Sequence, residues 1–214
     1  MPLISFISQT GNIGKSVLAT ALAVESINNK LPVAIADLDH EHRTSLEIQQ
    51  DRTSSGIEPI FKVYTPETAK EALTCFKNED KLQIIDCPSR ASKATIEVSK
   101  KSDLIVQPTT CSKKDMDRCI ETFYTLSANN IPVDKMLIVI NRVGTEAEYR
   151  RALDYLNQVE IEGQKIPIVS TCIYEKQNYR NALNDGFSII ETASQSLNEV
   201  AKSVVHQILS ATLK

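Results

Sequence analysis

Short runs of apolar residues recur along the chain, and most of them show no alternation between apolar and polar positions. A strand of this kind is typical of a parallel sheet that helices cover on both faces. The stretches between the runs carry apolar residues three or four positions apart, which predicts amphipathic helices. The chain therefore predicts an α/β fold with a mostly parallel sheet. The predicted strands are 3–7, 31–37, 60–64, 81–86, 103–107, 135–141 and 166–170, with 60–64 the weakest.

Helices are predicted in the gaps, with the clearest bounds at 15–29, 66–77 and 194–213. Apolar residues of the last helix form one stripe, which predicts packing against the core. That helix lacks the basic face and bulky aromatic residues of a membrane-surface helix, so we expect no membrane attachment. The segment 52–56, RTSSG, is predicted to be the most flexible loop. No repeat or linker divides the chain, so residues 1–214 are predicted to form a single domain.

Composition narrows the class of protein. The chain has 214 residues, of which 42% are hydrophobic, and this is enough for one substantial core. The formal net charge of −3 means that any binding to nucleic acid requires a local basic patch. The cysteines are scattered without a C-x-x-C pair, which fits a reducing compartment. No apolar run approaches the roughly 20 residues of a membrane span, so we expect a cytoplasmic protein.

The segment TGNIGKS follows the first predicted strand and opens the first predicted helix. Backbone N–H groups at such a helix start can hold phosphate oxygens. The phosphate-loop pattern G-x-x-x-x-G-K-[ST] is complete except for its first glycine, where Gln9 stands. Lys15 would reach the β- and γ-phosphates, and the Ser16 hydroxyl would ligate Mg²⁺. A chance G-K-S at a helix start is the alternative. The predicted nucleotide-binding residues of this loop are Thr10, Gly11, Asn12, Ile13, Gly14, Lys15, Ser16 and Val17.

Carboxylates end two other predicted strands. Asp86 closes the apolar run LQIID, an arrangement typical of the Walker B strand, whose carboxylate holds the magnesium shell. Asp37 and Asp39 end the strand 31–37, and their spacing lets one face the metal and the other an attacking water. The alternative for either residue is capping of the next helix. The predicted magnesium site consists of Ser16, Asp37 and Asp86.

In this order, the motifs resemble those of the ParA/MinD family of deviant Walker ATPases. TGNIGKS is similar to the family's phosphate loop, DLD at 37–39 to its acidic motif, and IIDCP at 84–88 to its Walker B motif. The later segments SDLIVQPTT with Asp115, LIVINRV at 137–143, and 173–191 continue the resemblance, the last of them to plasmid-partition ParA proteins. The resemblance implies a P-loop NTPase fold that binds ATP with Mg²⁺.

The resemblance also implies roles for single residues. Lys15 and Asp39 would be the catalytic residues, with Asp39 orienting the water that attacks the γ-phosphate. Asn141 would bind the adenine edge, because an amide offers a donor and an acceptor in one plane. A strand-end cap is the alternative for Asn141. Arg142 would stack on the base or remain solvated.

Thr10 stands where the family has its signature lysine, and Asn12 stands where it has glycine. By the resemblance, that lysine reaches across an ATP-bound dimer to the partner's phosphates, and a charge of this kind is worth roughly 10³–10⁵ in rate. Threonine cannot supply a positive charge, and no Lys or Arg precedes Lys15. We therefore expect ATP binding with slow hydrolysis, or an altered dimer interface. Asn tolerates the left-handed backbone, so the loop can still turn at Asn12.

A plasmid-partition role, which the resemblance implies, includes an ATP-dependent homodimer, non-specific DNA and a partner protein of the centromere-binding type. It also implies association with the nucleoid. Ordinary solvated helix faces are the alternative for the basic residues involved. The candidate DNA contacts are Lys113, Lys114, Arg118, Arg180 and Lys202.

Two other classes of protein and one further site remain open. One class is an ATP-dependent enzyme of the dethiobiotin synthetase or cobyrinic acid amidating kind, and the other is a non-catalytic nucleotide-binding adaptor in DNA transfer. His40 and His42 would share a face in a strand, yet a metal site needs further ligands that the neighbouring sequence lacks. A solvated loop is the alternative for this segment.

Overall fold

The computed structural model describes residues 2–76, 80–89 and 92–212. Its centre is a six-stranded sheet in the order β3-β2-β4-β1-β5-β6, in which every neighbouring pair is parallel. The strands are β1 (Leu3–Phe6), β2 (Val33–Asp37), β3 (Lys62–Tyr64), β4 (Leu82–Asp86), β5 (Leu104–Thr109) and β6 (Met136–Ile140). The helices are α1 (Lys15–Asn28), α2 (Thr44–Ser54), α3 (Ala69–Ala72), α4 (Lys93–Lys101), α5 (Lys113–Ser127), α6 (Glu146–Asn157), α7 (Gln177–Asn184) and α8 (Gln195–Thr212), with a 3₁₀ turn at Val133–Lys135.

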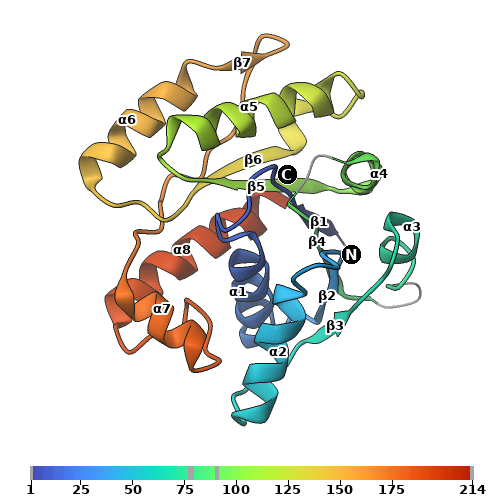
Figure 1. Cartoon of the computed structure of the whole chain (residues 1–214), viewed down its shortest axis with the longest axis vertical. Helices are drawn as coiled ribbons and strands as arrows, with labels where there is room; N and C mark the ends of the chain where they lie inside the picture. The colour runs from blue at the N-terminus through green and yellow to red at the C-terminus, as the bar shows by residue number, and fades with distance from the viewer. Residues whose placement is uncertain (1, 77–79, 90–91, 213–214) are drawn as a thin grey trace.

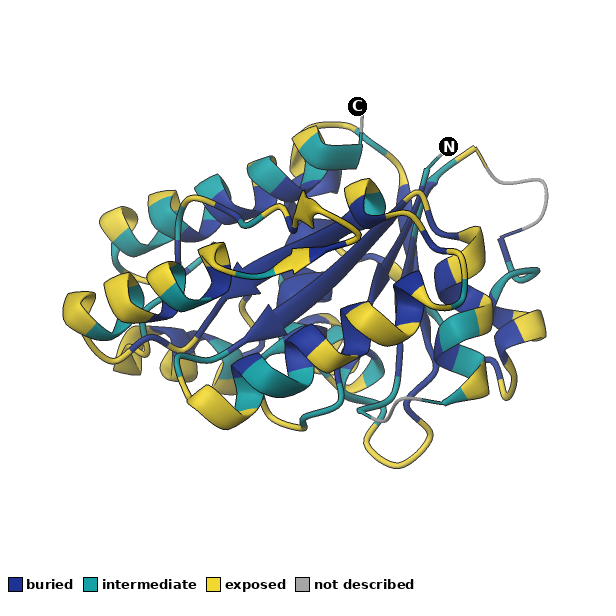
Figure 2. Cartoon of the chain, turned by 90° about the horizontal axis from the view of Figure 1, so that it is seen from above, coloured by how far each residue is buried: buried dark blue, intermediate teal, exposed yellow. Residues whose placement is uncertain are grey.

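Helices cover both faces of the sheet. Figure 1 shows α1, α2, α7 and α8 on one side and α3, α4, α5 and α6 on the other. Each side has its own hydrophobic core against the sheet. The strands between the cores are buried at nearly every position, while the outer faces of the helices are exposed (Figure 2). This arrangement confirms the predicted α/β fold and explains why the strands lack apolar–polar alternation.

The strand register brings the acidic motifs to one edge of the sheet. In the parallel ladders Asp86 of β4 pairs with Asp37 on one side and with Phe6 of β1 on the other. The carboxyl ends of β1, β2 and β4 therefore lie level. The loop that follows β1 and the residues that follow β2 meet at this edge, as expected for ligand sites in parallel sheets.

Some predicted elements differ from the structure. Residues 166–170 form no strand, and a single bridge joins Ile168 to Ile138 of β6. Pro167 has no N–H to donate, so it cannot extend a ladder there. The helix predicted at 66–77 is reduced to α3, which begins after Thr68 accepts a hydrogen bond from the Glu71 amide. The predicted ends of the helices 66–77 and 194–213 lie outside the described residues. A short hairpin, β7 (Glu160–Ile161) and β8 (Gln164–Lys165), was not predicted.

The segment predicted to be the most flexible loop is instead anchored. Arg52 lies in the last turn of α2 and is fully buried. Its guanidinium donates to the Glu191 carboxylate at 2.6 Å and to the carbonyl oxygens of Pro59 and Gly186. A buried guanidinium requires such partners. The prediction of a loop was wrong for residues 52–54, which belong to α2, and local sequence could not reveal this anchor because the carboxylate that holds Arg52 is 139 residues away.

Among the described residues, no helix has the length and apolarity needed to cross a membrane.

Candidate functional site

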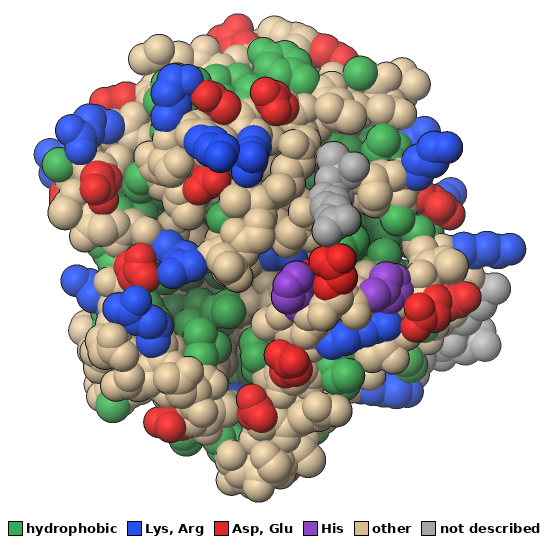
Figure 3. All heavy atoms as spheres, viewed as in Figure 1, with side chains coloured by type: hydrophobic (Ala, Val, Ile, Leu, Met, Phe, Trp, Pro, Cys, Tyr) green, Lys and Arg blue, Asp and Glu red, His purple; other side chains and the backbone are tan. Residues whose placement is uncertain are grey.

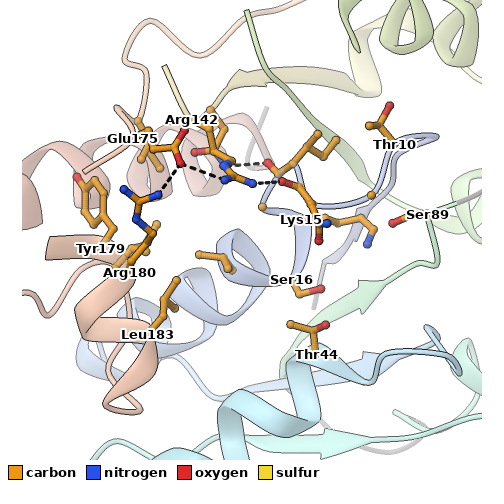
Figure 4. Close-up of a pocket in the computed structure, with 18 of the residues that line it drawn as sticks. Thr10, Lys15, Ser16, Thr44, Ser89, Arg142, Glu175, Tyr179, Arg180 and Leu183 are labelled. Carbon is orange, nitrogen blue, oxygen red and sulfur yellow. Dashed lines mark hydrogen bonds and ion pairs between the residues drawn. The ribbon is translucent and has the colours of Figure 1, made fainter. Parts of the chain in front are cut away.

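A pocket of about 410 Å³ opens at the carboxyl edge of the sheet, between the loop after β1 and helix α7. In Figure 3 it is a hollow with a hydrophobic floor, and charged side chains surround its mouth. All of the predicted loop residues from Thr10 to Val17 line it. The close-up in Figure 4 shows Thr10, Lys15 and Ser89 near one end of the pocket and Tyr179, Arg180 and Leu183 near the other. The pocket therefore has a polar end at the loop and a more apolar end at α7.

The loop owes its shape to two residues in the left-handed region. Gly14 precedes α1 with φ +89°, and Asn12 has φ +59°. The prediction that the chain can turn at Asn12 is confirmed. A Cβ atom on Gly14 would lie 2.1 Å from the Asn141 amide nitrogen, so the close approach of β6 also requires glycine. The start of α1 directs backbone N–H groups into the pocket, where they suit an anion.

Lys15 contacts the carboxylate that ends β4. Its Nζ lies 3.4 Å from Asp86 Oδ1, and both side chains are buried. The other carboxylate oxygen of Asp86 accepts a hydrogen bond from the Ser45 hydroxyl at 2.8 Å. Among the described residues, Asp86 Oδ1 has no hydrogen-bond partner. A buried carboxylate oxygen in this state suits a cation or a water molecule bound to one.

Asp37 is fully buried beside Asp86 and supports the loop that follows it. One oxygen accepts a hydrogen bond from the Asp39 amide and the other from the Leu46 amide. Burial, and then the negative charge of Asp86, raise the pKa of the Asp37 carboxyl to about 6. The carboxylate therefore connects β2 to the start of α2. Its predicted role at the metal stays a prediction.

Asp39, unlike Asp37, lines the pocket. Its Oδ1 accepts hydrogen bonds from the amides of Glu41 and His42, and His42 Nδ1 lies 3.3 Å from the same oxygen. The side chain thus shapes the turn after β2 and presents a negative charge to the pocket. The role of Asp39 in orienting water stays a prediction.

The two histidines of this turn have separate partners. His40 contacts Glu67 and the Arg43 guanidinium, whereas His42 contacts Asp39. Within residues 2–76, 80–89 and 92–212, no group of three or more His, Cys, Asp or Glu side chains could hold a metal ion. Residues 40–42 form a turn whose side chains are exposed.

Asn141 and Arg142 follow β6 and hold the phosphate loop. Asn141 Nδ2 donates to the Ile13 carbonyl at 2.8 Å, and Arg142 donates to the Asn12 carbonyl at 2.5 Å. Arg142 also pairs with Glu175 at 3.1 Å. Both residues line the pocket. Their side chains contact the loop, and Arg142 also contacts Glu175. Their contact with a base stays a prediction.

Sequence patterns missed the end of the pocket at α7. Tyr179 is buried there, and its hydroxyl donates to the Leu197 carbonyl at 2.9 Å. Its apolar neighbours would suit a flat aromatic ring. No local pattern marks these residues as a site, because the turn after β6 and the packing of α7 bring them to the loop. The apolar residues that line this end are Val17, Ile173, Tyr179, Leu183 and Ile189.

The predicted DNA contacts do not form one surface. Lys113, Lys114 and Arg118 lie on α5, which packs on one face of the sheet, whereas Lys202 lies on α8 on the other face. Arg180 of α7 lines the pocket and pairs with Glu175 at 3.1 Å. Lys113 pairs with Asp117, and Lys202 lies 3.9 Å from Glu25. Any basic patch is therefore smaller than the five residues predicted from sequence.

The geometry agrees with comparisons to known proteins. Residues 4–189 match the CbiA family, described as the CobQ/CobB/MinD/ParA nucleotide binding domain. The chain belongs to this family. The match covers the phosphate loop, the acidic strand ends and all of α7, so the ParA/MinD family expected from the motifs is confirmed.

Individual relatives are distant. The "Maintenance of carboxysome distribution protein A" of Halothiobacillus neapolitanus (strain ATCC 23641 / c2) is 24% identical over 131 residues, which span 57% of this chain and 59% of that protein. A putative plasmid partition protein from Borrelia burgdorferi B31, bound to AMPPNP, has a TM-score of 0.74 at 12% identity and covers 98% of both chains. The septum site-determining protein MinD from Pyrococcus horikoshii OT3, complexed with Mg-ADP, has a TM-score of 0.71 at 13% identity, covering 97% of this chain and 95% of that one. At these identities the structures show the shared fold.

Proposed function

We propose that the protein is an ATP-binding switch that places cargo within the cell, as its relatives named for plasmid partition and carboxysome distribution suggest. The observation that carries the proposal is the meeting of the phosphate loop and Asp39 in one pocket that apolar side chains line at its other end. The helix start would bind the phosphates, and the wall at α7 would take the base. The Mg-ADP and AMPPNP bound to structural neighbours support this choice of ligand.

Magnesium fits the residues at the loop. Ser16 lines the pocket, and Asp86 offers a buried oxygen that accepts no hydrogen bond from the described residues and has the Lys15 ammonium 3.4 Å away. These two groups would hold the ion, with Asp37 adding negative charge behind them. The ion would neutralise phosphate charge as the terminal phosphoryl group leaves. Lys15 would bind the phosphates, and Asp39 would orient the attacking water.

Hydrolysis is proposed to be slow because Thr10 supplies no positive charge. Replacing Thr10 with lysine is expected to raise turnover, measured as released phosphate in steady state. Unchanged turnover in Thr10→Lys would show that the missing lysine does not limit the rate.

ATP binding is proposed to favour a homodimer that associates with non-specific DNA. A partner protein of the centromere-binding type would stimulate hydrolysis and so end this ATP-bound state. Lys113 and Lys114 at the start of α5 are the exposed basic residues that would face DNA. With a net charge of −3, such binding is expected to be weak and to fall steeply with salt. The proposed location is the cytoplasm, at the nucleoid.

Two measurements on the purified chain test this proposal. Isothermal titration with Mg-ADP and Mg-AMPPNP is expected to detect binding, and absence of heat and of any thermal shift would refute the nucleotide site. Turnover is then compared with and without non-specific DNA at low and moderate salt. Stimulation by DNA supports the partition class, whereas turnover that requires a small carboxylic acid would indicate a ligase of the dethiobiotin synthetase kind. Binding without turnover in any condition would indicate a nucleotide-binding adaptor, which the neutral Thr10 favours.

A further inference from the structure

Positive charge is scarce at the phosphate end of the pocket. Lys15 is the cation of the loop, and it already lies 3.4 Å from Asp86 Oδ1. Asp37 at the end of β2 and Asp39 just after it add two more buried carboxylates. Arg142 also contacts the loop, but its guanidinium is already engaged by the Asn12 carbonyl and by Glu175, which pairs with Arg180 as well. A triphosphate brings about four negative charges, and even one bound Mg²⁺ offsets only half of them.

The Arg118 side chain reaches the phosphate loop at Thr10, which lines this end of the pocket. Arg118 occupies the second turn of α5, and α5 follows β5, the neighbour of β1 in the sheet. Side chains on a helix tilt toward its N-terminus, so the Arg118 side chain is directed to the same sheet edge as the phosphate loop. Its Nη1 lies 3.5 Å from Thr10 Oγ1, a contact between residues 108 positions apart.

The Arg118 guanidinium has no carboxylate partner within residues 2–76, 80–89 and 92–212. Most other arginines in that part of the chain are paired with acidic side chains. Arg151 is unpaired as well, but it is exposed on α6, whereas Arg118 is half-buried. A half-buried guanidinium held only by a neutral hydroxyl loses hydration without gaining an opposite charge. Its environment therefore favours the arrival of an anion.

We propose that Arg118 binds the terminal phosphate of the nucleoside triphosphate and so provides the positive charge that Thr10 lacks. The proposal rests on the function proposed above, since it requires a nucleotide in the same pocket. Without nucleotide, Thr10 holds the guanidinium at the edge of the loop. With a triphosphate, the planar group donates charge-assisted hydrogen bonds to the outermost phosphate oxygens, for which its geometry is suited. The diphosphate lacks this group, so Arg118 distinguishes ATP from ADP. The proposal concerns binding of the phosphate, and slow hydrolysis remains as stated.

The test compares dissociation constants for Mg-ADP and the non-hydrolysable Mg-AMPPNP by isothermal titration. Arg118→Met keeps most of the apolar stem and removes the charge. It is expected to weaken AMPPNP binding at least about tenfold, because charge-assisted hydrogen bonds to the outermost phosphate are lost, while ADP binding changes less than about twofold. Arg118→Lys is expected to lie between wild type and Arg118→Met. Arg151→Ala, which removes the other unpaired arginine, is the matched control and is expected to bind both nucleotides as the wild type does.

A second variant separates charge from structure. Adding Thr10→Lys to Arg118→Met returns a cation to the edge of the loop and is expected to recover at least half of the lost preference for AMPPNP. Equal losses for both nucleotides, no loss for either, or no recovery in the double variant would overturn the proposal. If the wild type binds neither nucleotide, the failure belongs to the proposed function itself.

Discussion

Gly14 lies so close to Asn141 that a Cβ atom on the glycine would be 2.1 Å from the amide nitrogen. The same amide nitrogen donates to the Ile13 carbonyl, so the end of β6 and the phosphate loop hold each other in place. Gly14 also has φ +89°, where an L side chain is strained.

We therefore expect Gly14→Ala to abolish nucleotide binding and to lower the unfolding free energy by about 2 kcal/mol or more, from the strain at positive φ together with the displaced amide. Titration calorimetry and urea unfolding measure the two effects. Gly11→Ala is the control for the unfolding free energy alone, because a Cβ atom there would have no neighbour within 4 Å and Gly11 is not at positive φ, although it lines the pocket. An equal loss of unfolding free energy in both variants would contradict this explanation.

Asp39→Asn is expected to keep nucleotide binding and to reduce turnover at least about a hundredfold, since a carboxamide cannot supply the charge that orients the water. Asparagine suits this test better than alanine because its Oδ1 can still accept from the amides of Glu41 and His42. Binding is followed by calorimetry and turnover by released phosphate. If binding is lost as well, Asp39 belongs to the metal site or to the structure of the turn.

Arg180→Ala is expected to weaken nucleotide binding several-fold, because Arg180 lines the pocket and pairs with Glu175. It should leave the salt dependence of DNA binding unchanged, whereas Lys114→Ala, which removes an exposed charge on α5, should lower that slope by about one. Titrations of labelled duplex at several salt concentrations measure the slopes. A reduced slope in Arg180→Ala, with normal nucleotide affinity, would restore Arg180 as a DNA contact.

Arg52→Ala is expected to destabilise the fold by about 3–5 kcal/mol, since it leaves the carboxylate of Glu191 without its buried partner. Arg150→Ala is the control, because Arg150 and Glu146 form an exposed pair one turn apart on α6, and such pairs contribute about 0.5 kcal/mol or less. Urea unfolding of both variants provides the comparison. A small effect of Arg52→Ala would mean that the last turn of α2 is not anchored by this ion pair.

Local patterns predicted much of the fold. The buried strands of the parallel sheet and the helix after TGNIGKS depend on apolar periodicity and on a short motif, both of which lie within a few consecutive residues. The strand ends that carry Asp37, Asp39 and Asp86 were predicted for the same reason. Parallel register then places two of these carboxylates side by side.

The rest depends on contacts between distant parts of the chain. Arg52 appears as part of a polar loop in the sequence and is buried because Glu191 and Gly186 meet it. Arg118 appears as one basic residue among several, and only the approach of α5 to the loop after β1 brings it to Thr10. Tyr179 and Glu175 became part of the pocket because the chain crosses back over the end of β6. No local pattern encodes these distances.

Glu175 joins two arginines of the pocket wall through a single carboxylate oxygen. Glu175 Oε1 accepts from Arg142 and from Arg180, each at 3.1 Å. Both guanidinium groups thus depend on one acidic side chain. A single substitution at Glu175 would remove the side-chain link between the turn after β6 and helix α7 and would leave two arginines of the pocket wall without their carboxylate.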